Sequence, residues 1–177
     1  TLTKGGQFSA TFPYGRTAER EDVFYYSAPF FTTKYFAWLR LGQINTYTQA
    51  RDFLDKVYCY PRGYGVFGII KEFLDNKLIR FERPNNMQGC FKMLHIKRVD
   101  FIVTSTDTAL KVLQGLGKSS SDVQKSSFSV SKVSLHLLVS KQLPNAQVVI
   151  DTFNNGLNTL QENGRYEALI EEFDWKE

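Results

Sequence analysis

The sequence is poor in the residues that build metal and redox centres. It contains only two cysteines and two histidines among 177 residues. Together with Cys59 and Cys90, His95 and His136 are too scattered along the sequence to complete the four-ligand set of a structural zinc site. We therefore expect neither a metal nor a cofactor. The sequence leaves open whether the two cysteines form a disulfide or remain free buried thiols.

Long apolar runs and dense positive charge are also missing. No stretch approaches the roughly 20 apolar residues that span a bilayer. The net charge is +4, but the basic residues are spread among 18 acids and the run 95–98 is short, so we expect no nucleic-acid partner. The chain does not begin with Met, and residues 1–4 lack the apolar core of a signal peptide, so we expect a preceding segment to have been processed away or left out.

Apolar and aromatic residues are plentiful, and they make up 42% and 15% of the chain. This suffices for one domain or two small lobes. The stretch from Thr17 to Phe31 stands out, because Thr-Ala-Glu-Arg precedes an aromatic run that Ser-Ala-Pro interrupts. Arg20 is a candidate anion ligand, since guanidinium stays charged and binds carboxylates bidentately. Alternatively, the aromatic side chains form core and Arg20 is a surface charge.

The pattern of apolar residues predicts an α/β fold. A strand over 7–12 ends in the turn 13–15, Thr17 caps a helical turn, and a second strand covers 35–41 before the turn 42–45. From Tyr47 strands and helices alternate, which indicates crossover units and a parallel sheet. We expect a helical turn near 48–54, strands at 56–60, 78–81 and 99–103, and helices at 66–74 and 87–96, with His95 on a helix face.

Two of these strands end in polar or glycine-rich segments. Pro61–Gly65 leads from a strand into a helix, so its backbone N–H groups can meet a polar ligand. Thr104–Asp107 follows the strand at 99–103 and lies at its carboxyl end, where open parallel sheets bind ligands. Helix capping by Thr106 or Asp107 is the alternative interpretation.

The last third of the chain predicts a flexible connection, a strand and two helices. The connection covers 115–125, and the strand covers 133–139 with His136 on a partly wet side. An amphipathic helix follows Pro144 and ends at Asn163-Gly164. The final helix is expected to bury Tyr166, Leu169, Ile170 and Phe173.

Several motifs occur in an order that resembles one protein family. Thr17-Ala18-Glu19-Arg20 followed by Phe24–Phe30 is similar to Thr-x-x-Arg and Phe-Ser-x-Pro-Tyr, and Lys97-Arg98-Val99-Asp100 is similar to Gly-Arg-Val-Asp. Residues 54–63 resemble a shortened Leu-x-Gly-Lys-x-Val strand with its glycine turn, and residues 143–170 resemble a closing helix pair. Together they resemble the extracytoplasmic solute-binding proteins, family 3, of polar amino-acid ABC importers.

This resemblance implies a fold and a function. The fold is the type II periplasmic binding protein fold, with two hinged lobes: a partial first lobe at 1–46, a second lobe at 47–125, and a return to the first lobe at 126–177. The protein would bind an amino acid or other small carboxylate between the lobes, without catalysis, for an ABC permease in the inner membrane. It would reside in the periplasm. A first lobe without its N-terminal part would expose apolar surface, so we also expect self-association.

The resemblance also implies site residues. Arg20 would bind the ligand carboxylate beside a contact from Gly15, and Tyr64 and Gly65 would offer backbone N–H groups and a hydroxyl. Ser105 stands where the family has an acid for the ligand ammonium, with Asp107 two residues later. The nearby cation Arg62 could favour a more acidic ligand or lie in solvent.

Two other functions fit the same resemblance. One is a ligand-sensing domain of a receptor. The other is a dehydratase-like enzyme in which Arg20 holds a carboxylate while Asp107 or Glu19 moves protons.

Overall fold

The computed structural model describes residues 8–43 and 47–173, and the chain divides into two units. Unit 1 combines the segments up to Thr33 and from Val133 onward, whereas unit 2 is the continuous segment Lys34–Lys132. Both changes of unit fall inside long strands, β3 (Phe31–Arg40) and β7 (Val123–Ser140). In the described part of the chain no helix is long and apolar enough to cross a membrane.

Unit 2 is built on a sheet whose central strands are parallel. The strand order is β7, which belongs to this unit up to Lys132, then β3, β6 (Phe101–Thr104), β4 (Val57–Cys59) and β5 (Arg80–Glu82). Strand β4 pairs in parallel with β5 and with β6, and β3 runs antiparallel to β6. The predicted crossover units and parallel sheet are confirmed. The carboxyl ends of β4, β5 and β6 consequently lie at one edge of this sheet.

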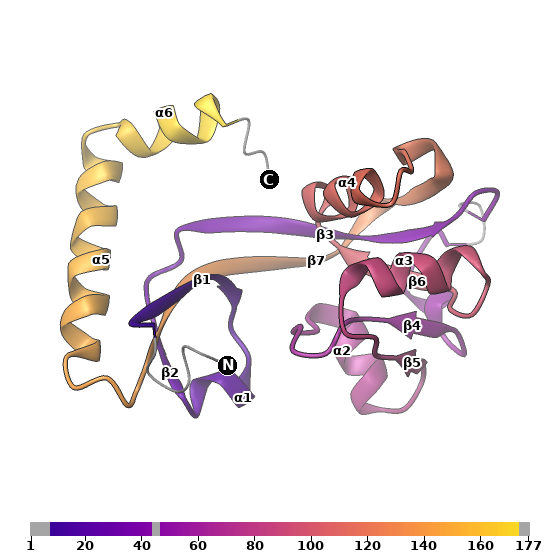
Figure 1. Ribbon diagram of the computed structural model, residues 1–177, viewed down its shortest axis with the longest axis horizontal. Helices are drawn as coiled ribbons and strands as arrows, with labels where there is room; N and C mark the ends of the chain where they lie inside the picture. The colour runs from indigo at the N-terminus through magenta and orange to yellow at the C-terminus, as the bar shows by residue number, and fades with distance from the viewer. Residues whose placement is uncertain (1–7, 44–46, 174–177) are drawn as a thin grey trace. The chain divides into compact units, whose positions relative to one another are not determined.

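Both faces of this sheet are covered by helices, which explains its strongly apolar strands. Helix α2 (Gly68–Asp75) contributes Ile70 to the core on one face, whereas α3 (Met87–His95) and α4 (Thr106–Gly115) build the core on the other (Figure 1). The strands alternate accordingly, so that Phe101 lies in the first core and Ile102 in the second. Two 3₁₀ turns complete the unit, η2 (Ala50–Phe53) and η3 (Ser120–Asp122).

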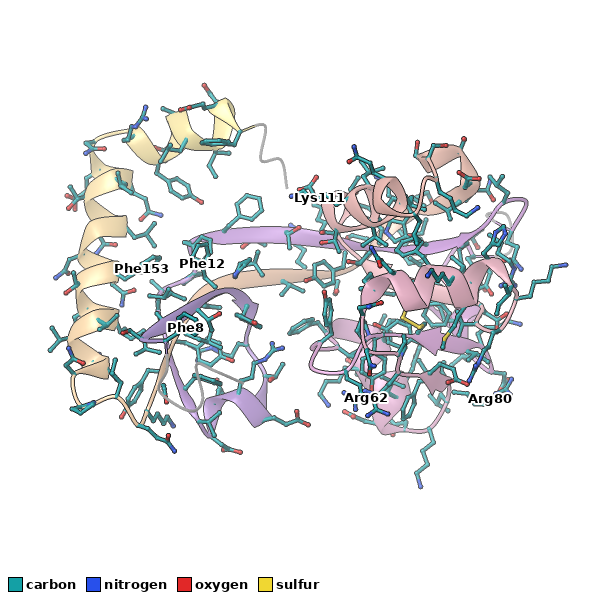
Figure 2. The ribbon with its side chains drawn as sticks, viewed as in Figure 1. Phe8, Phe12, Arg62, Arg80, Lys111 and Phe153 are labelled. Carbon is teal, nitrogen blue, oxygen red and sulfur yellow. A yellow bond between two sulfur atoms is a disulfide. The ribbon has the colours of Figure 1, made fainter. Side chains whose placement is uncertain are left out.

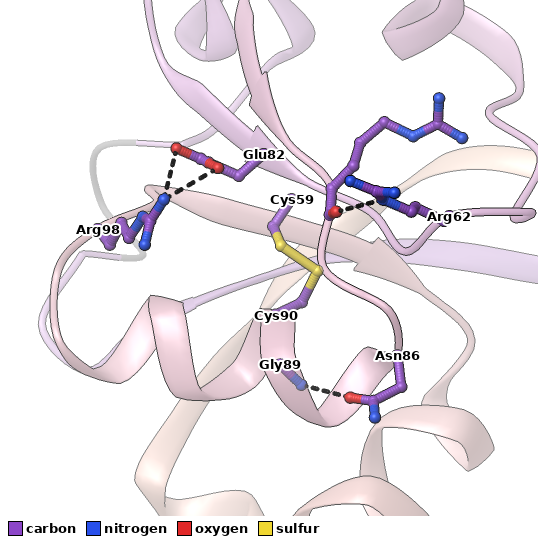
Figure 3. Close-up of a disulfide and its surroundings, with 8 residues drawn as sticks. Cys59, Arg62, Glu82, Asn86, Gly89, Cys90 and Arg98 are labelled. Carbon is purple, nitrogen blue, oxygen red and sulfur yellow. Dashed lines mark hydrogen bonds and ion pairs between the residues drawn. A yellow bond between two sulfur atoms is a disulfide. The ribbon is translucent and has the colours of Figure 1, made fainter.

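A disulfide joins Cys59 at the end of β4 to Cys90 on α3 (Figure 3). Their Cα atoms are 5.5 Å apart, and neither residue is exposed to solvent. This settles the alternative that the sequence left open. The bond ties the end of the central strand to the helix that covers it.

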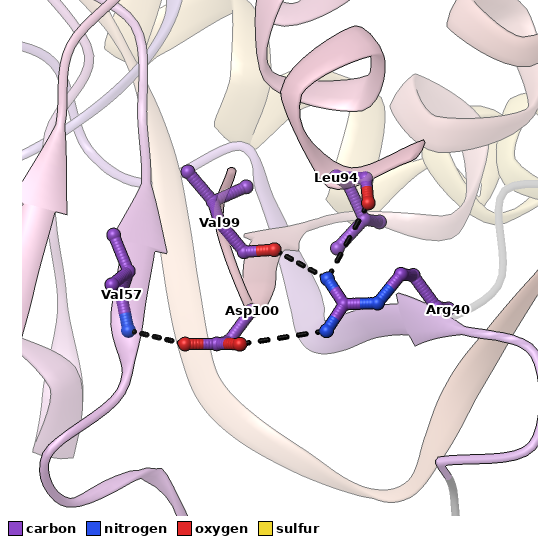
Figure 4. A network of polar contacts seen from close by, with 5 residues as sticks. All are labelled: Arg40, Val57, Leu94, Val99 and Asp100. Carbon is purple, nitrogen blue, oxygen red and sulfur yellow. Dashed lines mark hydrogen bonds and ion pairs between the residues drawn. The ribbon is translucent and has the colours of Figure 1, made fainter. Parts of the chain in front are cut away.

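A polar network holds together the amino ends of β4 and β6. The Arg40 guanidinium donates to the Val99 carbonyl oxygen at 2.5 Å and to Asp100 Oδ1 at 3.4 Å, while Asp100 Oδ2 accepts the Val57 N–H at 2.9 Å (Figure 4). Asp100, part of the motif resembling Gly-Arg-Val-Asp, is therefore structural. Lys97 stands at the glycine position of that motif and adopts the left-handed conformation there, with φ of 63°.

Unit 1 is a small sheet covered by helices. Strands β1 (Ala10–Gly15) and β2 (Phe24–Tyr26) both pair antiparallel with β7, and the short helix α1 (Ala18–Glu21) connects them. Helix α5 (Ala146–Glu162) packs on this sheet, and α6 (Arg165–Glu172) follows it. The core is small and consists of Leu137, Val139, Ala146 and Ile150, with half-buried neighbours.

Several expectations for the ends of the chain were wrong. Pro13–Gly15 is not a turn, because β1 continues to Gly15 and absorbs Pro13 at a register shift between Thr11 and Tyr14. Segment 115–125 already contains η3 and the first residues of β7. Residue 7 of the first predicted strand and residues 44–45 of the turn after β3 lie outside the described residues.

Burial in unit 1 also departs from the prediction at two places. His136 is buried rather than facing solvent, since Nδ1 is 2.8 Å from the Ser27 carbonyl oxygen and the ring packs edge-on against Tyr26. On α6, Tyr166, Leu169 and Ile170 are only half-buried, and Phe173 after its end is 62% exposed. Helical spacing correctly indicated one apolar face of α6, but it does not report how much of that face is covered.

Candidate functional site

Arg20 lies in α1 beside the end of β1. Its Nη1 donates to the Gly15 carbonyl oxygen at 2.9 Å, and its guanidinium carbon lies 4.9 Å from the centre of the Tyr14 ring. Gly15 is buried and Arg20 is half-buried. The structure thus brings Arg20 and Gly15 together, and Gly15 uses its carbonyl oxygen to orient the guanidinium. A cation–π contact and a backbone acceptor reduce the number of conformations that this side chain can adopt.

The hydroxyl of Tyr26 lies close to the same helix. It accepts the Thr17 N–H at 3.4 Å, and Thr17 makes no side-chain cap bond to α1. Burial raises the pKa of Tyr26, and the Thr17 N–H and the Arg20 charge oppose this only in part. The phenol is therefore neutral at physiological pH and adds no negative charge beside Arg20.

The segment after α1 is structural. Ser27 is buried, and its Oγ accepts the Leu137 N–H at 3.0 Å while its own N–H donates to the Leu137 carbonyl oxygen. The Ala28 N–H donates to Asn154 Oδ1 on α5, and the Tyr166 hydroxyl donates to the Phe30 carbonyl oxygen at 2.5 Å. This segment is fixed to β7, α5 and α6, so in the stretch from Thr17 to Phe31 it is Arg20 that stays a candidate ligand residue.

In unit 2, the two candidate segments lie at the carboxyl edge of the parallel sheet, as their order predicted. Tyr64 is 50% exposed, and its N–H donates to the Pro61 carbonyl oxygen at 3.2 Å. That N–H closes the turn, so Tyr64 can offer a solute its hydroxyl but not its N–H. Gly63 has φ of 80°, a conformation that glycine adopts without strain.

Ser105 is the N-cap residue of α4, a role that had been assigned to Thr106 or Asp107. Its Oγ accepts the Thr108 N–H at 3.3 Å and donates to Thr108 Oγ1 at 3.0 Å. Thr106 and Asp107 are instead the first helical residues, and Asp107 is exposed. A serine that already caps a helix is a poor substitute for an acid that would hold an ammonium group.

Reasoning from the sequence missed one cation at this edge. Arg83 directly follows β5, and its guanidinium carbon lies 4.8 Å from the centre of the Tyr60 ring. Arg62 Nε donates to the Arg83 carbonyl oxygen at 3.4 Å (Figure 3). The parallel order of β4 and β5 could have indicated this neighbourhood, because it places the residues that follow the two strands side by side.

No protein-family model matches the sequence, and no curated protein matches it either. Solved structures do match. An ancestral arginine-binding protein bound to arginine has a TM-score of 0.77 at 18% identity, and the match covers 97% of this chain and 74% of that one. Holo ArgBP from T. maritima has a TM-score of 0.73 at 21% identity, covering 97% and 72%.

A third match comes from another organism. The GluR0 ligand-binding core from Nostoc punctiforme, in complex with L-glutamate, has a TM-score of 0.69 at 21% identity, covering 97% of this chain and 75% of that one. At this level of identity the similarity establishes the fold. The fold class predicted from the sequence, that of type II periplasmic binding proteins, is therefore confirmed.

Proposed function

We propose that this protein binds a small polar solute through a carboxylate group and delivers it to an ABC importer, without catalysing a reaction. The observation that carries the proposal is the oriented, half-buried guanidinium of Arg20, which the Gly15 carbonyl oxygen and the Tyr14 ring hold in place. Guanidinium presents its N–H donors in a planar fork, a geometry that suits bidentate capture of a carboxylate. In unit 2 we propose Tyr64, Gly65 and Asp107 as further contact residues.

The fold supports the same proposal. Structures that share it include a substrate-binding protein of an amino-acid ABC transporter. We place the protein outside the cytoplasm, and the Cys59–Cys90 disulfide supports this location, because disulfides form and persist in oxidising compartments. The partners we propose are a small carboxylate ligand and a membrane permease.

A thermal-shift screen of the chain against amino acids, small carboxylates and amines tests the proposal. A ligand that binds only the native state stabilises it by RT ln(1 + [L]/Kd), about 2.7 kcal/mol at a hundredfold excess over Kd. We expect carboxylates to raise the melting temperature of the wild type. Arg20→Ala should lose this response, whereas Arg20→Lys should retain a weaker one, because Lys keeps the charge but not the bidentate fork.

Arg16 provides a matched control. It is also an arginine of unit 1 that stacks on a tyrosine, with its guanidinium carbon 4.8 Å from the centre of the Tyr26 ring, but it is exposed and pairs with Glu21 at 3.1 Å. Arg16→Ala should respond to carboxylates as the wild type does. If Arg20→Ala responds as well as Arg16→Ala, the role proposed for Arg20 is wrong.

A further inference from the structure

The loops that follow β4 and β5 run side by side at the carboxyl edge of the unit 2 sheet. Backbone hydrogen bonds continue beyond the strands: the Tyr60 N–H donates to the Glu82 carbonyl oxygen at 3.2 Å, and the Arg62 N–H donates to the Pro84 carbonyl oxygen at 3.0 Å. Each loop carries one arginine, Arg62 and Arg83. The backbone therefore sets these two cations next to each other.

The arginine pair rests on a rigid aromatic base. The Arg83 guanidinium lies over Tyr60, and the Tyr60 ring is stacked on Tyr58 with centroids 5.1 Å apart. Tyr58 stacks in turn on Phe101, also at 5.1 Å, and both of these residues are buried core. The Arg83 guanidinium thus lies at the end of a stack of rings that begins in the core of unit 2.

The pair carries uncompensated positive charge. Among the described residues, Arg16, Arg40, Arg98 and Arg165 each lie within 4.0 Å of an acid, whereas neither Arg62 nor Arg83 has such a partner. The nearest acid on β5, Glu82, is engaged by Arg98 at 3.3 Å instead. Two adjacent like charges repel each other, and an anion bound between them relieves that repulsion.

The rest of this edge adds little negative charge. Lys125 Nζ lies 3.5 Å from Thr106 Oγ1 at the start of α4, and it lies over the Phe36 ring. Ser105 is a neutral helix cap, and the one acid among the proposed contact residues is Asp107, which is exposed and can meet the ammonium group of an amino acid. A cationic solute such as arginine, the ligand of one structure with this fold, would meet mainly positive charge here.

We infer that Arg62 and Arg83 bind a second anionic group of the solute, so that the ligand is a dianion such as an acidic amino acid or a dicarboxylate. This inference rests on the proposed function and names its ligand class. An arginine pair suits a second carboxylate, since each guanidinium can donate two hydrogen bonds to it.

Isothermal titration of the chain with L-glutamate, L-glutamine and L-arginine, and with succinate and succinamate, tests the inference. Within each acid–amide pair the two probes differ in one charge and hardly in shape. We expect the acid to bind about tenfold more tightly than the amide in both pairs, and arginine to bind more weakly than glutamate. The preference should shrink as salt is added, because the groups are exposed.

Variants assign the preference to the pair. The double variant Arg62→Met and Arg83→Met keeps the apolar stems and should bind the acid and the amide equally. Arg80→Met is the matched control, because Arg80 is an exposed arginine at the opposite, amino end of β5. It removes one like charge from the same strand and should leave the preference intact.

The outcomes separate the two proposals. If no carboxylate binds the wild type, the proposed function is wrong. If carboxylates bind but the amides or arginine bind as tightly as the dianions, the function stands and this inference is overturned. A preference for dianions that survives in the double variant overturns the assignment to Arg62 and Arg83.

Discussion

Ser105 shows how a residue at a ligand-binding edge can serve the fold instead. Its hydroxyl satisfies the Thr108 N–H at the start of α4. Ser105→Ala should therefore lower the free energy of unfolding by about 1 kcal/mol, the usual cost of a lost N-cap. Carboxylate affinity should not change. Chemical denaturation and titration of the same sample measure both quantities.

Thr106→Ala is the control, because Thr106 is the next residue but caps nothing. It should cost less stability than Ser105→Ala. A Ser105→Ala variant with unchanged stability and weakened ligand binding would instead make Ser105 a ligand contact.

The hydrogen bonds that the Asp52 carboxylate accepts lead us to expect that the stability of the protein depends on pH. Its Oδ2 accepts the N–H groups of Thr48 at 2.7 Å and Gln49 at 3.0 Å, and the Thr48 bond is the main reason why the pKa of Asp52 is lowered. A carboxyl whose pKa is lowered by folding stabilises the native state above its unfolded pKa, and this contribution is lost as pH falls through the folded pKa.

Asp52→Asn should therefore lose less stability than the wild type between about pH 5 and pH 3, the range in which aspartate titrates. Urea unfolding at several pH values measures how the free energy of unfolding of each protein changes with pH. If this change is the same for the variant and the wild type, the Asp52 hydrogen bonds contribute nothing to the acid sensitivity.

Single residues divide clearly into those that the sequence could predict and those it could not. Arg20 could be named as a candidate because its motif is local and contiguous. Arg83 was not named, since its place beside Arg62 depends on the pairing of β5 with β4, two separate segments of the chain. His136 was misjudged because its burial comes from Ser27, a partner 109 positions away.

The disulfide is the covalent link between two elements of unit 2, β4 and α3. It closes a segment of 31 residues, for which chain entropy predicts about 3–4 kcal/mol of stabilisation. The free energy of unfolding of the double variant Cys59→Ala and Cys90→Ala should be lower by about this amount. Denaturation with and without reductant measures it: reductant should affect the wild type only.

The same bond has a second expected effect, on binding. Cys59 immediately precedes Tyr60, and Cys90 follows Gly89, which packs so closely on Pro84 that a Cβ there would lie 2.8 Å from the Pro84 Cβ. The loops bearing Arg62 and Arg83 are thus both anchored on α3. Loss of the disulfide should weaken the binding of dianions more than the binding of their amides. If both affinities fall equally, the disulfide contributes to stability but not to the preference for dianions.

Secondary structure was predictable where packing leaves a regular pattern. Helices α3 and α5 follow from their apolar spacing, and β4 and β6 from short apolar runs. The full length of β7 did not follow, because its first half alternates buried residues with Lys and Ser. Ser126 illustrates the difficulty: it is buried because its hydroxyl accepts the Ala37 N–H.

The molecule as a whole carries exposed aromatic surface on unit 1. Phe8 and Phe12 are 56% and 66% exposed. Phe12 packs edge-on against Phe30, with ring centroids 6.3 Å apart, and Phe30 packs edge-on against Phe153, with ring centroids 6.0 Å apart. Figure 2 labels Phe8, Phe12 and Phe153 in this unit. We predict that a second copy of the chain covers these rings, because exposed apolar patches commonly mark interaction sites.

Light scattering over a dilution series should therefore report a dimer or larger assembly that dissociates on dilution. Phe12→Ser should shift the assembly toward monomer. Phe81→Ser is the control, since Phe81 is similarly exposed but lies on β5 of unit 2. A monomer at every concentration, or an equal effect of both variants, contradicts the prediction.

The division of the chain into one continuous and one split unit has a consequence for its synthesis. Unit 2 is complete once residue 132 has emerged, but β1 must wait for the far end of β7, since Ala10 pairs with Val139. Contacts between distant segments form late, because closing the long intervening loop costs entropy. During synthesis we therefore expect unit 2 to fold first, and β1 to be among the last of the described strands to join its sheet.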